Sequence, residues 1–184
     1  MDGQKEDDQA LNSVSQSIFV TVGTTRFDDL IKTVTCPSFL KTLKNCGYNK
    51  LLIQTGGGKR VQKDEILPCV EVESYDFKKS IYDDILNSAL VISHAGAGSI
   101  IEVLKAKKPL IVVINEKLMD NHQFELAEAF QNMNYLYYCT CSSLEAVIKE
   151  KDMSKLVKYE AGRPEIFGSY IAEFMGLSND KKVA

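Results

Sequence analysis

The sequence ALVISHAGAGSIIEVL, at residues 89–104, joins two patterns that belong to different kinds of secondary structure. Its first part, Ala89–Ser93, is a short apolar run, which is typical of a strand buried on both faces. From about Ser99 to Ala106 the apolar residues recur at helical spacing, and the residues in between are rich in glycine. This stretch therefore predicts one strand–turn–helix unit of an α/β sheet.

The same alternation continues on both sides of this unit. Apolar runs predict five further strands, at residues 17–22, 50–54, 69–72, 110–114 and 135–139. Helices are predicted after Phe27, around Ile81–Leu86 and over Asn121–Asn132, and Pro37 should divide the first of these regions into two short helices. Continuous apolar strands separated by helices predict a doubly wound α/β domain with a parallel, Rossmann-like sheet.

Length and composition limit the domain organisation. A chain of 184 residues with 45% hydrophobic and 26% charged residues is globular and too short for two full lobes. Residues 1–16 carry four acids and one base without an apolar segment, so they predict a disordered acidic extension rather than a signal peptide. We expect the domain at residues 17–176 and a tail at 177–184.

Charge and hydropathy exclude two classes of partner. The chain beyond residue 16 is formally neutral, and the whole chain has a pI near 5.5. It therefore lacks the basic field that non-specific nucleic-acid binding requires. No run of about 18 apolar residues is present, so we expect no direct membrane span.

The five cysteines indicate a reducing compartment, because there is no C-x-x-C and no signal peptide. We expect a cytoplasmic chain without a zinc site. Cys139 and Cys141 are two residues apart in a predicted strand and share one face, which favours core thiols over a redox role.

The segment from Pro164 carries two adjacent apolar lines at helical spacing. These lines are Ile166, Tyr170 and Phe174 in one, and Phe167, Ile171 and Met175 in the other. Such a broad stripe predicts a helix at residues 164–176. The helix either folds back on its own domain or docks on a partner, and we favour docking.

Three predicted loops at the carboxyl ends of strands are rich in glycine and hydroxyl residues. They are Gly23-Thr24-Thr25, Gly56-Gly57-Gly58 and the run His94-Ala95-Gly96-Ala97-Gly98-Ser99. Glycine lets backbone N–H groups approach a ligand closely, and the helix N-terminus that follows favours negative charge. Each loop alone could be a tight turn. Three at one edge of the sheet predict an anion site, with Ser99 as a helix cap or phosphate donor.

Known nucleotide motifs do not fit this pattern. The run from Gly96 has Ile101 where a dinucleotide fingerprint has its third glycine, and it follows the fourth strand rather than the first. A nicotinamide cofactor is therefore not expected. Gly58-Lys59-Arg60 lacks the Ser/Thr of a P-loop, and no G-x-S-x-G is present, so an ATPase and a serine hydrolase are not expected either.

The two histidines and one glutamate complete the candidate site. His94 and His122 both fall at the predicted ligand edge, although a lone histidine is usually structural, and two are too few to predict a metal. Glu102 lies one turn into the helix after the glycine loop, where a carboxylate can accept two ribose hydroxyls, although a surface glutamate is the default. Together these groups predict a nucleotide-diphosphate site.

Three longer stretches resemble one protein family. FVTVGTTRFDDL at 19–30, LVISHAGAGSIIEVL at 90–104 and KPLIVVINEKLMDNHQFELA at 108–127 resemble the cytosolic catalytic subunit of the two-subunit UDP-N-acetylglucosamine transferase of dolichol-linked N-glycan precursor synthesis. More distantly, the chain is similar to the C-terminal, donor-binding half of a bacterial GT-B transferase. The resemblance spans about residues 17–176. It implies one GT-B half-lobe, an inverting hexosyltransferase and a substrate, UDP-GlcNAc, in place of a cofactor or metal.

The resemblance also implies roles for single residues. One side of the donor would contact Gly23, Thr24, Thr25 and Gly56. On the other side, the diphosphate would be held by Gly96, Gly98 and Ser99. Glu102 would take the ribose, Asn121, His122 and Gln123 would face the sugar, and Tyr75–Lys78 would supply backbone contacts to uracil. The general base would come from the partner lobe, with His94, which flanks the phosphates, or His122 as alternatives.

A GT-B cleft needs two lobes, and this chain supplies one. The resemblance therefore implies a membrane-anchored, acceptor-binding partner at the cytosolic face of the endoplasmic reticulum, with GlcNAc-diphosphodolichol as the acceptor. A nucleotide-binding regulatory module without activity is the alternative.

Overall fold

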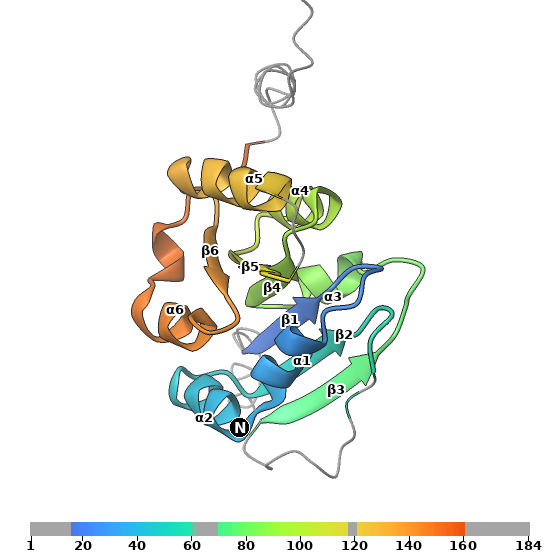
Figure 1. Ribbon diagram of the computed structural model, residues 1–184. Coiled ribbons are helices and arrows are strands. Elements are labelled where there is room, and N and C mark those ends of the chain that lie inside the picture. The colour runs from blue at the N-terminus through green and yellow to red at the C-terminus, as the bar shows by residue number, and fades with distance from the viewer. Residues whose placement is uncertain (1–15, 60, 62–69, 118–120, 161–184) are drawn as a thin grey trace, which may run out of the picture.

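The computed structural model describes residues 16–59, 61, 70–117 and 121–160, with only the backbone described for Asn121 and His122 (Figure 1). The strands are β1 (Ser17–Thr21), β2 (Lys50–Gln54), β3 (Glu71–Tyr75), β4 (Leu90–His94), β5 (Leu110–Ile114) and β6 (Tyr137–Thr140). The helices are α1 (Asp28–Thr35), α2 (Pro37–Asn45), α3 (Tyr82–Leu86), α4 (Ala97–Lys105), α5 (Asn121–Asn132) and α6 (Leu144–Glu150), followed by a 3-10 turn at Met153–Lys155.

The six described strands form one sheet in the order β3–β2–β1–β4–β5–β6, and every neighbouring pair is parallel. This order confirms the predicted doubly wound, Rossmann-like domain. Four of the five residues in β1, β4 and β5 are buried, as expected of strands covered on both faces.

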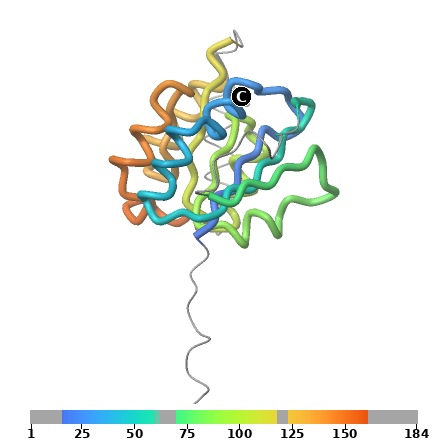
Figure 2. Tube along the Cα trace, turned by 90° about the horizontal axis from the view of Figure 1, so that it is seen from below, coloured from blue at the N-terminus to red at the C-terminus, as the bar shows by residue number. Residues whose placement is uncertain are grey.

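Two helical layers enclose the sheet. One apolar cluster contains residues of α1, α2 and α6, and the other contains residues of α3, α4 and α5. Figure 2 shows α6 beside α2, although Thr42 and Glu145, which share a 2.8 Å hydrogen bond, are 103 residues apart. As predicted, Pro37 separates α1 from α2 and is the first residue of α2, where its missing N–H has no helical partner in any case.

The free edge of β6 is protected by side chains. Tyr138 N–H donates to Oε1 of Gln131 over 3.0 Å, and Thr140 N–H donates to Oγ of Ser143 over 3.1 Å. These bonds occupy donors that an edge strand would otherwise offer to another chain.

Three helices end in the same Schellman motif, in which a residue of positive φ follows the cap. Those residues are Gly47 after α2, Lys107 after α4 and Asn134 after α5, with φ of 88°, 57° and 59°. In α4, Lys107 N–H donates to the Leu104 carbonyl over 2.9 Å and Lys108 N–H donates to the Val103 carbonyl over 3.4 Å. Lys107 therefore occupies a position that favours glycine.

The structure corrects several predicted boundaries. The third strand is Glu71–Tyr75 rather than 69–72, because this edge strand carries polar residues, with Lys50 Nζ 3.1 Å from Glu73 Oε1. The sixth strand is Tyr137–Thr140 rather than 135–139, and α6 follows it without having been predicted. Helix α4 begins at Ala97 with Gly96 as its N-cap, so Ser99 is the third helical residue and not a cap.

The predictions for the cysteines and for the terminal segments can be compared with the structure only where residues are described. Cys139 is buried in β6, and burial raises the pKa of its thiol to about 12, which fits a core thiol. Cys141 lies half-buried in the turn after β6. The predicted extension at 1–16 lies outside the described residues except for Gln16, and the helix at 164–176 and the tail at 177–184 lie outside them entirely.

Substituting Lys107→Gly should stabilise the protein. Relief of left-handed strain, about 1–2 kcal/mol for an L-residue, should exceed the roughly 0.4–1 kcal/mol that the added freedom of glycine costs through the unfolded state. We expect a net gain of about 0.5–1 kcal/mol in urea unfolding. The control Lys105→Gly, two residues earlier in helical backbone, should destabilise the protein instead. Equal losses in both variants would contradict this assignment.

Candidate functional site

The strand order reverses between β1 and β4. Because β1 has β2 on one side and β4 on the other, the chain leaves these neighbouring strands toward opposite faces of the sheet. Thr21 pairs with Ser93, so both strands end at the same level. The loops that begin at Gly23 and His94 therefore meet at the point where an open α/β sheet forms its ligand crevice.

The ring of His94 packs against the backbone of both loops. A Cβ at Gly23 would lie 2.6 Å from Cε1 of His94, and a Cβ at Gly96 would overlap Nε2 of the same ring. Gly23 also has a φ of 61°, a conformation that favours glycine. The two glycines thus leave room for one imidazole between the exits of β1 and β4.

His94 is neutral near pH 7. Burial lowers the pKa of its imidazole below the ordinary value of 6.5, and an interaction with the Thr21 backbone offsets only part of this effect. Its Nδ1 atom is buried and has no hydrogen-bond partner among the described residues. That nitrogen is therefore inaccessible to a substrate hydroxyl in this arrangement.

Two consecutive hydrogen bonds fix the loop after β1 to the last residues of β1 and β2. Gly23 N–H donates to Oγ1 of Thr21 over 3.0 Å, and Thr21 Oγ1 donates to Oε1 of Gln54 over 2.5 Å. Both Thr21 and Gln54 are buried. Sequence reasoning missed these two residues, although a threonine and a glutamine at the carboxyl ends of two apolar strands were a usable signal.

The second glycine loop supports the first. The N–H groups of Gly56, Gly57 and Gly58 donate to the carbonyls of Asp76, Thr25 and Thr55 over 3.2, 3.1 and 2.9 Å. A Cβ at Gly56 would lie 2.5 Å from the Thr25 carbonyl oxygen. Contact between this loop and a ligand would therefore not use these three N–H groups, because Gly57 and Gly56 bind the β1 and β3 exits and Gly58 closes the loop's own turn.

The N-terminus of α4 is different. Gly96 caps the helix without a side-chain hydrogen bond, and no described group accepts from the N–H groups of Ala97, Gly98 and Ser99. A Cβ at Gly98 would have no atom within 4 Å among the described residues. This end of α4 carries the partial positive charge and free donors that suit an anion.

Glu102 lies on the same side of α4 as this end. It is four residues from Gly98 and three from Ser99, so the three share one helical face. Ser99 and Glu102 are both half-buried, whereas Ile100, Val103 and Leu104 face the core. A carboxylate one turn from an anion site can accept the hydroxyls of a ligand that extends along the helix.

The loop after β5 reaches across the sheet to α1. Lys117 Nζ lies 2.6 Å from Oδ2 of Asp29, and Lys117 N–H donates to Oδ1 of Asn115 over 3.2 Å. The hydrogen bond to Lys117 lowers the pKa of the Asp29 carboxyl. Asn121, His122 and Gln123 begin α5 beyond residues 118–120, and Gln123 is half-buried.

The structure thus brings together the predicted residues of the first and fourth strands' loops and of α4. Thr24 and Thr25 are exposed beside them. A cavity of about 630 Å³ lies elsewhere, along β6, with Ile114, Phe124 and Tyr138 among its lining residues. The described residues contain no group of three or more His, Cys, Asp or Glu side chains placed to hold a metal.

Sequence comparisons identify relatives over most of the chain. The family model for the glycosyltransferase family 28 C-terminal domain matches residues 17–172. The UDP-N-acetylglucosamine transferase subunit ALG13 of Homo sapiens is 50% identical over 127 residues, which is 69% of this chain and 11% of the human protein. The subunit of the same name from Saccharomyces cerevisiae is 32% identical over 192 residues, covering 86% of this chain and 95% of the yeast protein. The chain therefore spans about a tenth of the human relative's length.

Solved structures give the same result. The solution structure of ALG13 superposes with a TM-score of 0.65 at 28% identity, covering 85% of this chain and 95% of that one. The crystal structure of Acinetobacter baumannii MurG superposes with a TM-score of 0.58 at 17% identity, covering 81% of this chain and 44% of that one. The second likeness concerns the fold alone, and it covers less than half of that chain.

Substituting Gly96→Ala should destabilise the protein, because the new methyl group overlaps the His94 ring while the φ of −82° suits alanine. Overpacking of this kind costs about 1–3 kcal/mol in urea unfolding. In the double variant with His94→Ala the cost of the extra methyl group should disappear. Gly98→Ala, whose new Cβ would have no described atom within 4 Å, is the matched control and should fold like wild type. Additive losses in the double variant would exclude the contact as the cause.

Proposed function

The chain belongs to glycosyltransferase family 28, among the UDP-N-acetylglucosamine transferase subunits named ALG13, and we propose that it is the donor-binding catalytic subunit of a heteromeric enzyme. In this proposal the enzyme moves N-acetylglucosamine from UDP-GlcNAc to GlcNAc-diphosphodolichol. The step is the second sugar addition of N-glycan precursor assembly.

The observation that carries the proposal is the free N-terminus of α4 at the strand-order switch. A diphosphate placed there would accept from the N–H groups of Ala97, Gly98 and Ser99 and would face Gly23 and Thr24 of the β1 loop. The open space over Gly98 lets phosphate oxygens approach the backbone closely. Glu102 would accept the ribose hydroxyls, and Asn121, His122 and Gln123 would face the sugar.

The same helix end also suits the chemistry. In an inverting transfer, the acceptor hydroxyl oxygen bonds to the anomeric carbon as the bond from that carbon to the UDP oxygen breaks, and the hydroxyl proton passes to a general base. Negative charge then develops on the departing diphosphate. Backbone donors and the positive end of α4 would stabilise that charge more in the transition state than in the ground state.

We infer that the partner supplies the general base. His94 is packed between two backbone segments with its Nδ1 buried, so its role here is to hold the phosphate loops apart. The side chain of His122 lies outside the described residues, and it remains the alternative base on this chain.

Partner and location follow from the proposed acceptor. None of the helices in the described ranges is long and apolar enough to cross a bilayer. A lipid-linked acceptor would therefore be brought by a membrane-anchored, acceptor-binding subunit at the cytosolic face of the endoplasmic reticulum. The segment 164–176 is the proposed docking helix for that subunit.

Donor binding can be tested at Gly98. Gly98→Val should lower the affinity for UDP-GlcNAc at least about tenfold in calorimetry, because its side chain would occupy the space proposed for the diphosphate and a lost charged hydrogen bond alone is worth about 1.5–3 kcal/mol. The fold should be retained, as shown by an unchanged melting temperature. Unchanged UDP affinity in Gly98→Val would remove α4 from the site.

Glu102→Ala should lower the affinity for UDP as much as the affinity for UDP-GlcNAc. The substitution should matter less for a donor without ribose hydroxyls.

Reconstitution separates the enzyme from the regulatory alternative. Mixed with its membrane-anchored partner, the wild-type chain should transfer radiolabelled GlcNAc to GlcNAc-diphosphodolichol, and Gly98→Val should not. The isolated chain should be inactive in either case. Donor binding without transfer in the mixture, while both chains co-purify, would favour a nucleotide-binding regulatory module.

A further inference from the structure

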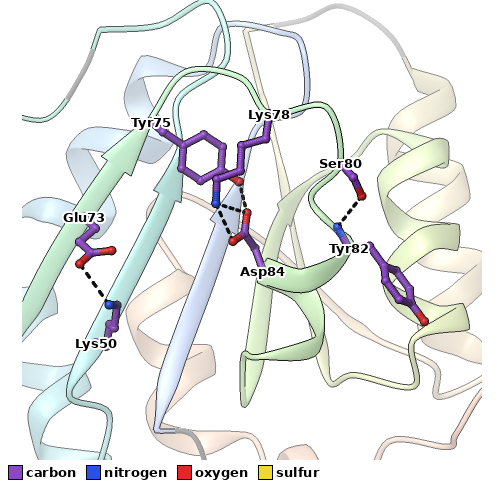
Figure 3. A network of polar contacts seen from close by, with 7 residues as sticks. All are labelled: Lys50, Glu73, Tyr75, Lys78, Ser80, Tyr82 and Asp84. Carbon is purple, nitrogen blue, oxygen red and sulfur yellow. Dashed lines mark hydrogen bonds and ion pairs between the residues drawn. The ribbon is translucent and has the colours of Figure 1, made fainter.

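We propose that Asp84 is a positioning residue, which holds the β3–α3 loop, residues 76–81, in the shape that selects the nucleotide base. This inference rests on the proposed function and extends it to base specificity. The carboxylate of Asp84 belongs to α3, whereas the groups that it binds lie at the end of β3 and within the loop (Figure 3).

The place of the base follows from the rest of the site. The proposed diphosphate lies between the exits of β1 and β4, and the proposed sugar subsite begins α5 on the β5 side. The ribose proposed at Glu102 lies on α4, which shares an apolar cluster with α3, so we place the base on the α3 side of the switch, toward β2 and β3. The N–H groups of Gly56–Gly58 after β2 already bind protein carbonyls, which leaves the loop after β3 as the source of backbone contacts.

The backbone of the β3–α3 loop has N–H and C=O groups without described partners. No described hydrogen bond uses the N–H or C=O of Phe77, Lys78 or Lys79, and the Phe77 side chain is 57% exposed. The loop entrance is fixed, because Thr55 N–H donates to the Tyr75 carbonyl over 2.9 Å and Gly56 N–H donates to the Asp76 carbonyl over 3.2 Å. At the exit, Tyr82 N–H donates to Oγ of Ser80 over 3.2 Å.

Asp84 holds the middle of the loop. Lys78 Nζ donates to both carboxylate oxygens of Asp84, over 2.7 and 2.9 Å, and the same ammonium lies 4.1 Å from the centre of the Tyr75 ring. Tyr75 Oη donates to Oδ2 of Asp84, so the three side chains form a closed set (Figure 3). The Asp84 side chain is only 12% exposed, which limits screening of its ion pair by solvent.

The Tyr75 hydroxyl is the hydrogen-bond donor to Asp84 in this cluster. Burial, followed by the hydrogen bond to Asp84, raises the pKa of the Tyr75 hydroxyl above its ordinary value. The hydroxyl therefore keeps its proton and its hydrogen bond to Asp84. Tyr75 and Asp84 both belong to regular elements, so Lys78 is the member whose position in the loop depends on the set.

A fixed loop can distinguish uracil from cytosine. Uracil presents an N–H donor at position 3 and an oxygen acceptor at position 4, whereas cytosine presents an acceptor and an amino donor there. A backbone C=O and N–H held at fixed positions complement only the first pattern, and the wrong base leaves polar groups unpaired. A loop released from Asp84 could reorient its peptide groups and accept either base.

The experiment is calorimetric titration of the 184-residue chain with UDP and with CDP. Wild type should prefer UDP by at least about tenfold, and Asp84→Asn and Lys78→Met should reduce that preference to within about threefold. Lys78→Arg, which keeps the charge, should retain it. Glu73→Gln is the matched control, because Glu73 lies on β3 two residues before Tyr75 and forms its ion pair with Lys50 of β2, outside the loop (Figure 3).

The preference is a ratio of two affinities of one folded protein, so a loss of global stability alone would leave it unchanged. An unaltered UDP preference in both Asp84→Asn and Lys78→Met, with wild type binding UDP, would overturn the role of Asp84 and leave the proposed function intact. Equal binding of UDP and CDP by wild type would also overturn this role. A wild-type chain that binds neither nucleotide would contradict the proposed function and, with it, this inference.

Discussion

The packing of one imidazole against two glycines sets the geometry on which the rest of the site depends. His94 ends β4, and its ring occupies the space where Gly23 and Gly96 have no side chain. Protein interiors are packed so closely that this contact fixes the separation of the two loops to within a methyl group. The direction in which α4 leaves the sheet follows from it, and so does the position of the free N–H groups at the start of that helix.

The glycine-rich loops of this protein divide their tasks by hydrogen bonding. Gly23 is held by Thr21 and Gln54, and Gly56–Gly58 donate to carbonyls of neighbouring loops. Among the three glycine-rich loops, the one at the start of α4 has successive N–H groups, those of Ala97, Gly98 and Ser99, without described partners. An anion site needs both parts, because donors can be preorganised for a ligand only when other bonds hold the backbone that carries them.

The β1–β4 switch belongs to one lobe of the proposed two-chain enzyme. The described cavity along β6 is a different place, because it lies beyond β5 and its lining includes no residue of the loops after β1 and β4. In the proposed two-chain enzyme, the second lobe would close over the exposed edge, exclude water and supply the base. In that proposal the α4 end supplies donors and Glu102 a carboxylate for the nucleotide, while the buried Nδ1 of His94 is not accessible as a base.

The sequence by itself determined the alternation of apolar strands and helices, the break at Pro37 and the three loops, because these features depend on local periodicity and on the backbone limits of proline and glycine. The resemblance of residues 90–104 and 108–127 to a known family also led to the correct family. Only the tertiary structure decided which backbone N–H groups of these loops bind other parts of the protein and which are without described partners. Gly56 N–H binds the carbonyl of Asp76, 20 residues away, and Thr21 binds Gln54, 33 residues away, whereas Gly98 N–H has no described partner. Such long-range partners leave no periodic signal, and the polar edge strand β3 and helix α6 were misjudged or missed for the same reason: their positions are set by neighbouring strands and helices rather than by their own pattern.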